Sequence, residues 1–586
     1  MPKTPTVLTA EDLAAISILS DAPKGALKAA AKKVEWFSLP GGRKLLSVGD
    51  ASDSIYFLKS GVLGAFNNNE DGTLNFIGHI RSGEPVGEMA FLGGVPHTAS
   101  IYAMRDSEIV RLPREAFEKL IKRHPTLMRS LAQMMVSRMR RHHRDGYDGA
   151  SEPKVFALLS TSPTINCVHI ARQLSEALCA LGRSCVIVGP EAEDSSSEWF
   201  DALERTHDVV LLHSPVADTH WFRLCLRQAD RLWLVGRADA RPSDPLLPPD
   251  RSPARMFRLV DVLLLHNKGE RTVSNGGDWQ RAANAERVFH WHQGSKSDVA
   301  RIARTAAGRS VGLVLSGGGA RSYAHIGAIR ALREAGVPID FAGGTSMGAI
   351  IAAGLALGWD DELMERNICD AFVHSNPLND YTLPVVALTR GRKVNRRLDR
   401  FFGDFRIENL EIPFFCVSSN LGSGCATIHR EGLLRRALRA SIALPGVLPP
   451  VVIDGEVHVD GAVVDNFPVN VMARLHRGLT VGVDVAREKG LKVDDFINPP
   501  GFFSWVMRHG LQEAPPIASL LMRSATIART SVQDARDTVD ILVLPDIAEV
   551  ELRDWKAYDQ AVEAGYRAMV EALKEGALTR LKHSPT

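Results

Sequence analysis

The chain has few of the residues and patterns that identify several classes of protein. Only seven of its 586 residues are cysteines, and they are scattered, odd in number and without a CxxC pair. This argues against a disulfide framework and against a thiolate metal site, so reduced thiols in a cytosolic protein are the simplest account. The net charge is only +2, and the sequence therefore lacks the positive excess that would favour a nucleic-acid partner.

Long apolar runs are also missing. Residues 1–9 contain no apolar segment of the kind that a signal peptide needs. The most apolar long window, 339–359, contains Asp340 and a glycine turn around Ser346, which do not suit a membrane-spanning helix. The sequence therefore predicts a cytoplasmic protein that is either soluble or peripheral to a membrane.

Two glycine turns each follow a short apolar run that is typical of a buried strand. The run 311–316 breaks at Gly317 and continues into apolar residues at helical spacing. The run 339–342 leads into Gly344-x-Ser346-x-Gly348, the form of a nucleophile elbow. In such an elbow the glycines leave room for a sharp turn between strand and helix that pushes the serine hydroxyl out over the sheet.

The first glycine turn has two alternative interpretations. A dinucleotide-binding fingerprint would need a third glycine where Ser322 stands, and a phosphate-binding Walker A loop would need Gly-Lys-Ser/Thr, which is absent. An oxyanion hole fits better, with backbone N–H groups of Gly318, Gly319 and Met347 as donors and Arg321 holding the loop or a nearby charge. Either turn alone could also serve only to pack a helix against a sheet.

A serine nucleophile needs a base, and the best downstream candidate is Asp460. It ends a predicted strand, 457–459, and precedes Gly461, so its carboxylate could point into a site. An ordinary turn aspartate is the alternative, because Asp-Gly pairs are common turn formers. Histidine is the usual partner of serine, and His458 and His325 are the candidates for a competing triad.

Three segments in this order resemble the three signatures of patatin-like phospholipases. They are Gly317-Gly318-Gly319-Ala320-Arg321, Gly344-Thr345-Ser346-Met347-Gly348 and Asp460-Gly461-Ala462. The resemblance continues through 440–450 and 464–469 and departs from the family at Ser322, where glycine is usual. It implies a Ser–Asp dyad without histidine, metal or cofactor: Ser346 as nucleophile, Asp460 as general base, and Gly318 and Gly319 as oxyanion donors.

The first part of the chain has short strands broken by turns from Trp36 to Leu112, a spacing that predicts a small antiparallel barrel or jelly roll, followed by a helix over 114–146. Gly87-Glu88 and its neighbours resemble the cyclic-nucleotide-binding domain. The resemblance implies that Glu88 takes the ribose hydroxyl and that an arginine takes the cyclic phosphate. Here His97, followed by Thr98, stands in place of that arginine, so the fold is expected without tight cyclic-nucleotide binding.

The middle of the chain alternates strands and helices, which predicts a doubly wound α/β sheet. Its first strand is followed by 160–166, which contain no Gly-Lys pair, so a spacer or regulatory role is expected. The sequence thus predicts a multidomain protein with an antiparallel barrel (10–130), a basic linker helix (131–152), a Rossmann-like α/β domain without a Walker A lysine (153–308) and an α/β patatin-like hydrolase domain (309–586).

This domain order resembles the bacterial relatives of neuropathy target esterase. It implies a serine esterase acting on carboxylic esters of phospholipids or lysophospholipids at a membrane surface. Two alternatives stay open: an esterase of neutral acyl lipids, and a regulatory ligand-sensing protein with a vestigial hydrolase domain.

The basic segments 138–144 and 389–400 are either solvated helix faces or sites that attract anionic lipid. The helix over 554–573 is expected to close the last domain without chemistry of its own.

Overall fold

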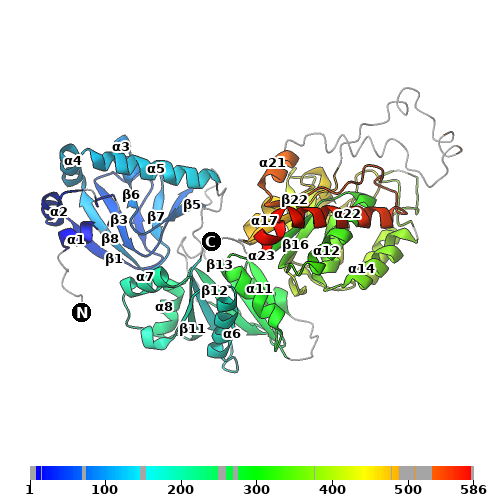
Figure 1. Ribbon diagram of the computed structural model, residues 1–586, viewed down its shortest axis with the longest axis horizontal. Coiled ribbons are helices and arrows are strands. Elements are labelled where there is room, and N and C mark those ends of the chain that lie inside the picture. Colours follow the sequence, from blue (N-terminus) through cyan, green and yellow to red (C-terminus); the bar gives the residue numbers. More distant parts are fainter. Residues whose placement is uncertain are drawn as a thin grey trace. The chain divides into compact units, whose positions relative to one another are not determined.

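The computed structural model describes residues 8–582, except 15, 17, 21, 69–73, 145–152, 248–258, 268–274, 375, 384, 477 and 487–530, of which only 504 and 507 are described. The chain divides into two compact units, 1–265 with 281–286 and 266–280 with 287–586. Figure 1 shows the strands and helices of both units along the chain.

The first unit begins with two four-stranded antiparallel sheets, in the orders β1-β8-β3-β6 and β2-β7-β4-β5. Their strands are β1 (Glu35–Leu39), β2 (Lys44–Leu46), β3 (Ser54–Ser60), β4 (Leu63–Asn68), β5 (Leu74–Ile80), β6 (Pro85–Val86), β7 (Ser100–Ala103) and β8 (Ser107–Pro113). Three short helices accompany them: α1 (Ala10–Ala14), α2 (Lys24–Ala31) and α3 (Glu88–Gly93). The predicted jelly-roll-like barrel is confirmed.

The single helix predicted over 114–146 is wrong, because the structure has two helices there, α4 (Arg114–Arg123) and α5 (Thr126–Arg144). The break falls at His124, whose φ of −133° and ψ of 78° are not helical. Pro125 follows, and a proline disfavours the helical conformation of the residue before it. The side chains of 138–144, where a cationic patch was proposed, lie outside the described residues, as does 145–152.

The middle region contains a parallel sheet in which β10-β11-β9-β12-β13 are consecutive neighbours. These strands are β9 (Val155–Ser160), β10 (Cys185–Val188), β11 (Val209–Pro215), β12 (Arg231–Arg237) and β13 (Leu259–His266), with the helices α6 (Cys167–Ala180), α7 (Ser197–Thr206) and α8 (His220–Gln228) between them. The predicted parallel α/β sheet is confirmed. Its order, 2-3-1-4-5 along the chain, differs from the 3-2-1-4-5-6 order of dinucleotide-binding folds, which corrects the label Rossmann-like.

The second unit opens with α10 (Gly276–Ala283) in part, β14 (Arg287–His292) and α11 (Lys296–Ala306). Arg287 donates to the carbonyl of Leu475, and Arg304 pairs with the fully buried carboxylate of Asp340 through two hydrogen bonds of 2.9 and 2.6 Å. The segment 287–306 therefore packs on the last domain. The domain boundary at residue 308 stays a prediction.

The main sheet of the second unit has the order β19-β20-β17-β16-β15-β21-β22, and β18 pairs with β17. Its strands are β15 (Val311–Leu315), β16 (Phe341–Thr345), β17 (Phe414–Asn420), β18 (Ala426–His429), β19 (Val451–Ile453), β20 (Glu456–Asp460), β21 (Leu479–Val483) and β22 (Ile541–Val543). The central strands β17, β16, β15, β21 and β22 are parallel, whereas β18, β19 and β20 join antiparallel. The buried β15 and β16 occupy the centre, as their apolar runs predicted.

The bounds of the helices described in this part of the chain are α12 (Ala324–Glu334), α13 (Met347–Ala356), α14 (Asp361–Ile368), α15 (Arg392–Phe402), α16 (Leu434–Ser441), α17 (Val469–Leu475), α21 (Ser531–Thr538), α22 (Tyr558–Ala572) and α23 (Leu578–Lys582). Of these, α13, α16, α17 and α22 pack against strands of this sheet. Glycines let α12 and α22 approach closely, since a Cβ at Gly327 would lie 1.9 Å from the carbonyl oxygen of Val562. The helix predicted near the end of the chain thus closes the hydrolase domain, as expected (Figure 1). Among the described residues, no helix combines the length and the apolar character that crossing a bilayer requires.

Candidate active site

The two glycine turns meet because their strands are neighbours. Strands β15 and β16 are parallel, and Leu315 pairs with Gly344 at their carboxyl ends. The loop that begins after Leu315 therefore lies beside the turn that carries Ser346. Parallel strands deliver their following loops to the same edge of a sheet, which is where ligand sites of such folds lie.

Ser346 occupies a strained turn between β16 and α13. Its φ of 54° and ψ of −127° are sparsely populated for a residue with a side chain, which costs on the order of 1–3 kcal/mol. The flanking glycines are required by space: a Cβ at Gly344 or Gly348 would lie 2.4 or 2.5 Å from the carbonyl oxygen of Leu315. The backbone N–H of Ser346 donates to the hydroxyl of Ser441 at 3.0 Å, which helps to hold this turn.

Strand register brings Asp460 to Ser346. Thr345 pairs with Val417 of the parallel β17, and the next residue, Ser418, pairs with Asp460 of the antiparallel β20. The Ser346 hydroxyl donates to Oδ2 of Asp460 at 2.7 Å, while Oδ1 accepts the N–H of Ala462 at 2.8 Å. The residue Asp460 is fully buried, so both oxygens of its carboxylate are directed by the protein.

The glycine loop is held from two sides. Gly317 donates its N–H to the carbonyl of Asn466, whose side-chain amide donates back to the carbonyl of Gly317 at 3.0 Å. Gly319 has a φ of +57°, and a Cβ there would lie 2.2 Å from the carbonyl oxygen of Leu552. Only glycine fits this position without displacing the backbone.

Three backbone amides near Ser346 are available as donors. Across the described part of the chain, no acceptor is assigned to the N–H groups of Gly318, Gly319 or Met347. Gly319 and Met347 line the same pocket as Ser346. Uncommitted N–H groups beside a nucleophile are what stabilises a developing oxyanion.

Arg321 ties the glycine loop to the last part of the chain. Its Nε donates to the carbonyl of Val550 at 2.8 Å, and the N–H of Ala320 donates to the carbonyl of Leu552 at 2.9 Å. Arg321 is buried and so supports the loop, one of the two roles considered for it. The support by Ser441, Asn466 and the 550–552 segment was missed in the sequence, although Ser441 and Asn466 fall within segments that carry the family resemblance.

The two candidate histidines have other partners. His325 is fully buried, its Nε2 lies 2.8 Å from the carbonyl oxygen of Ser316, and burial lowers its pKa to about 4. Nδ1 of His458 lies 2.9 Å from the hydroxyl of Ser418, and burial lowers the pKa of His458 as well. Among the described residues, Asp460 is the side chain that contacts the Ser346 hydroxyl, and the geometry favours a dyad over a triad.

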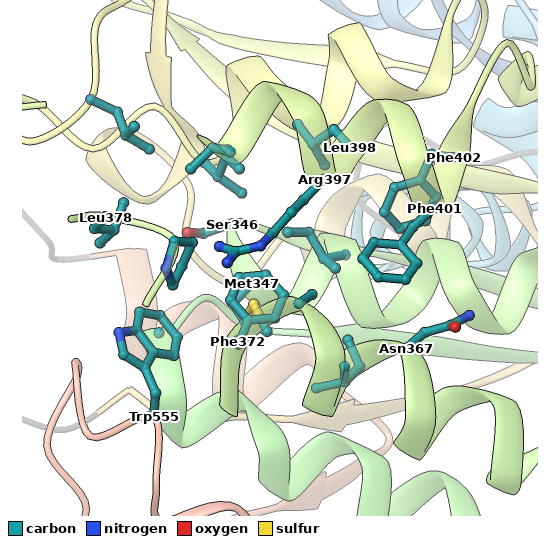
Figure 2. Close-up of a pocket in the computed structure, with 18 of the residues that line it drawn as sticks. Ser346, Met347, Asn367, Phe372, Leu378, Arg397, Leu398, Phe401, Phe402 and Trp555 are labelled. Atoms are coloured by element: carbon teal, nitrogen blue, oxygen red, sulfur yellow. The ribbon is translucent and has the colours of Figure 1, made fainter. Parts of the chain in front are cut away.

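An apolar pocket opens from Ser346 (Figure 2). It encloses about 720 Å³ that is not filled by atoms, part of it open to solvent, a size typical of ligand pockets. Aromatic and aliphatic side chains dominate its wall, among them Phe372, Leu398, Phe401, Phe402 and Trp555. The pocket suits an acyl chain, and Trp555, just before α22, contributes to its wall.

One charged side chain interrupts this apolar wall. Of the described residues that line the pocket, Arg397 alone carries a charge. It comes from α15, three residues after Val394 and four before Phe401, which also line the pocket, and Figure 2 shows its side chain extending from the helix toward the middle of the pocket. Burial, followed by the nearby Arg396, lowers the pKa of the Arg397 guanidinium. The basic segment 389–400 therefore contains both kinds of residue that were considered: Arg397 lines the pocket, whereas Arg396 on the same helix is exposed to solvent.

The three barrel residues that the sequence analysis placed in a nucleotide-binding-like site also lie around one pocket. Glu88, His97 and Thr98 line it together with aliphatic side chains. Glu88 and His97 are buried, with exposed fractions of 4% and 5%, and burial lowers the pKa of His97. This pocket belongs to the barrel and is separate from the pocket at Ser346.

Comparisons with known proteins match two parts of the chain to protein families. Residues 313–473 match the model of the patatin-like phospholipases, and residues 36–124 match the cyclic nucleotide-binding domain. A protein of Mycobacterium tuberculosis described as an uncharacterised NTE family protein is 32% identical over 585 residues, which is 95% of each chain.

Two longer relatives are more distant. Human patatin-like phospholipase domain-containing protein 6 is 26% identical over 613 residues, covering 91% of this chain and 44% of that protein. A lysophospholipase of Neurospora crassa is 27% identical over 646 residues, covering 92% and 42%. The chain thus spans less than half the length of these animal and fungal relatives.

Proposed function

The chain belongs to the NTE family and is a hydrolase of the patatin-like phospholipase type, and from this premise we propose that it is a serine esterase that cleaves carboxylic ester bonds of phospholipids and lysophospholipids through Ser346 and Asp460. The observation that carries this proposal is the 2.7 Å hydrogen bond from the Ser346 hydroxyl to the buried Asp460 carboxylate. The apolar pocket beside this pair would hold the acyl chain of the substrate.

In the first half of the reaction, the Ser346 hydroxyl attacks the ester carbonyl carbon while Asp460 takes its proton. The carbonyl oxygen becomes an oxyanion, which the N–H groups of Gly318, Gly319 and Met347 would receive. Asp460 then returns the proton to the alcohol that leaves, and the acyl group stays on Ser346. The strained turn supports this step because it fixes the hydroxyl against the base before the substrate arrives.

In the second half, water replaces the alcohol. Asp460 takes a proton from the water, the resulting hydroxide attacks the acyl-enzyme carbonyl, and the same amides receive the second oxyanion. Asp460 finally returns the proton to Ser346, and the fatty acid departs. One carboxylate can serve both halves because its second oxygen stays fixed on the N–H of Ala462.

Replacing Ser346 by alanine tests the proposal directly. We expect hydrolysis of a lysophospholipid and of a short-chain ester to fall together to the uncatalysed background, because both reactions need the same nucleophile. The fold should persist, which thermal unfolding would check. Full activity in Ser346→Ala would contradict the proposal, and an inactive native protein would favour the alternative of a vestigial hydrolase in a ligand-sensing protein.

Arg397 supports a substrate that contains phosphate over a neutral acyl lipid. A guanidinium is always charged and binds phosphate oxygens through paired N–H groups. Its position in an otherwise apolar pocket that also contains Ser346 suits a molecule with an ester, an acyl chain and an anionic group close together. In a lysophospholipid the glycerol places the phosphate near the ester in this way.

The substrate class is tested with Arg397→Gln, using Arg396→Gln as the matched control on the exposed face of α15. We expect kcat/KM for lysophosphatidylcholine to fall by about 10- to 100-fold in Arg397→Gln, the size of a lost charged hydrogen bond. Hydrolysis of a monoacylglycerol with the same acyl chain should change little in either variant. An equal loss on both substrates, or no loss on either, would contradict phosphate recognition by Arg397.

A further inference from the structure

The barrel pocket is lined by both polar and apolar side chains. His79, Glu88, His97 and Thr98 are among the polar ones, and Ile80 and Ile101 are among the apolar ones. The pocket encloses about 970 Å³ not filled by atoms, part of it open to solvent. A flat ligand with a polar edge would suit both kinds of lining, because buried polar groups require partners whereas aliphatic side chains accept a ring face.

His97 is held in the pocket and has hydrogen-bonding capacity to spare. Its backbone N–H donates to the carbonyl of Asp50, and its own carbonyl accepts the N–H of Gly49. The ring lies against Gly87, where a Cβ would be 2.8 Å from its Cε1. His97 is only 5% exposed, and its Nε2 is buried without a partner among the described residues. A buried unpartnered nitrogen in the wall of a cavity indicates a missing ligand group.

The charge of the pocket limits what this ligand can be. Among the described residues that line it there is no lysine or arginine; the titratable side chains are the imidazoles of His79 and His97 and the buried carboxylate of Glu88. The charged groups whose fields reach His97 are the acids Asp50 and Asp53, and burial holds the imidazole toward its neutral form by lowering its pKa. A phosphate anion placed here would lose its hydration beside acidic groups and without a cation, which is strongly unfavourable.

We propose that the barrel pocket binds an uncharged ribonucleoside, a base on a ribose without phosphate, in preference to a cyclic nucleotide. The match of residues 36–124 to a cyclic nucleotide-binding domain gives a pocket of suitable kind. Two ribose hydroxyls can donate to the Glu88 carboxylate, which only accepts, and Nε2 of His97 can bond to a polar group of the ligand. Removing the phosphate removes the part of a cyclic nucleotide that this pocket disfavours.

Calorimetric titration of the full chain tests the proposal, with adenosine, guanosine, cytidine and uridine each compared with its own 3′,5′-cyclic phosphate. At least one nucleoside should bind about tenfold or more tightly than its own cyclic phosphate, the effect of one uncompensated charge. Glu88→Gln should weaken the nucleoside. His97→Arg should reverse the preference by supplying a cation, whereas His169→Arg, which adds the same charge on exposed α6, should not.

Three results would overturn the proposal. The first is a cyclic nucleotide that binds the native chain as tightly as its nucleoside or more tightly. The second is the absence of binding by all four nucleosides up to about millimolar concentration, the weak limit of specific recognition. The third is a neutral acyl lipid that displaces the nucleoside and loses affinity in Glu88→Gln. Where His97→Arg does not fold, the native and Glu88→Gln titrations decide the matter alone.

Discussion

Replacing Asp460 by asparagine examines the proton acceptor while changing the shape of the site very little. The native carboxylate accepts two hydrogen bonds, from the Ser346 hydroxyl at 2.7 Å and from the N–H of Ala462 at 2.8 Å. In Asp460→Asn the amide oxygen can still accept from Ala462. The amide nitrogen then faces Ser346 and can only donate, so the serine proton has no acceptor.

The size of the loss follows from the role of a general base. Positioned acid–base catalysis contributes about 10²- to 10⁴-fold, roughly 3–5 kcal/mol of transition-state free energy. We therefore expect kcat to fall by this factor in Asp460→Asn. KM should change little, because Asp460 is absent from the described residues that line the acyl pocket. The oxyanion donors are untouched, so residual activity above background should persist.

The assay compares hydrolysis by Asp460→Asn and by His458→Gln, since a Ser–His–Asp triad and a Ser–Asp dyad predict opposite outcomes. The side chain of His458 is hydrogen-bonded to the Ser418 hydroxyl at 2.9 Å. Its replacement should therefore change kcat only slightly. Thermal unfolding of both variants excludes misfolding as the cause. An active Asp460→Asn together with an inactive His458→Gln would refute the dyad.

Two further changes probe the oxyanion loop and the buried histidine. Gly319→Ala should lower kcat by about 10²- to 10³-fold, because its Cβ would meet the Leu552 carbonyl oxygen at 2.2 Å and force the donor amides out of position; Gly336→Ala, at a φ of +67° with nothing within 4 Å, should cost only modest stability and no activity. His325 has a folded pKa of about 4 against 6.5 unfolded, so its stabilising effect is complete above pH 6.5 and is lost as the pH falls toward 4. The unfolding temperature should therefore drop between pH 7 and pH 5, and less so in His325→Gln; equal pH dependence in both proteins would contradict this.

Much of the fold was predictable because the hydrophobic pattern of each region is regular. The buried runs of β9, β11 and β12 and of β15 and β16 stand out in the sequence, since strands covered on both faces are continuously apolar. Strand β1 was missed because Glu35–Leu39 alternates only between exposed and half-buried residues. The break between α4 and α5 was missed although Pro125 marks it.

The candidate site was predictable only where a local motif carries it. Glycines 344 and 348 indicate the turn at Ser346 in the sequence, because the adjacent strand leaves no room for a side chain at either position. Ser441 and Asn466 act through contacts across 95 and 149 residues, which no local pattern reveals. Arg397 left a signal that could have been read, since the apolar Val394 and Phe401 lie three and four residues from it, whereas the residues at those spacings from Arg396 are all charged.

The pairing of Ser346 with Asp460 depends on register more than on either motif. Residue 460 reaches the serine from the opposite chain direction, because β20 runs antiparallel to β17 while β16 runs parallel to it. A shift of one residue in β20 would turn the carboxylate to the other face of the sheet. Gly461 permits that register, since a Cβ there would lie 2.2 Å from the carbonyl oxygen of Val417. The glycine that follows the aspartate is therefore part of what holds the base against the nucleophile, and not merely a turn former.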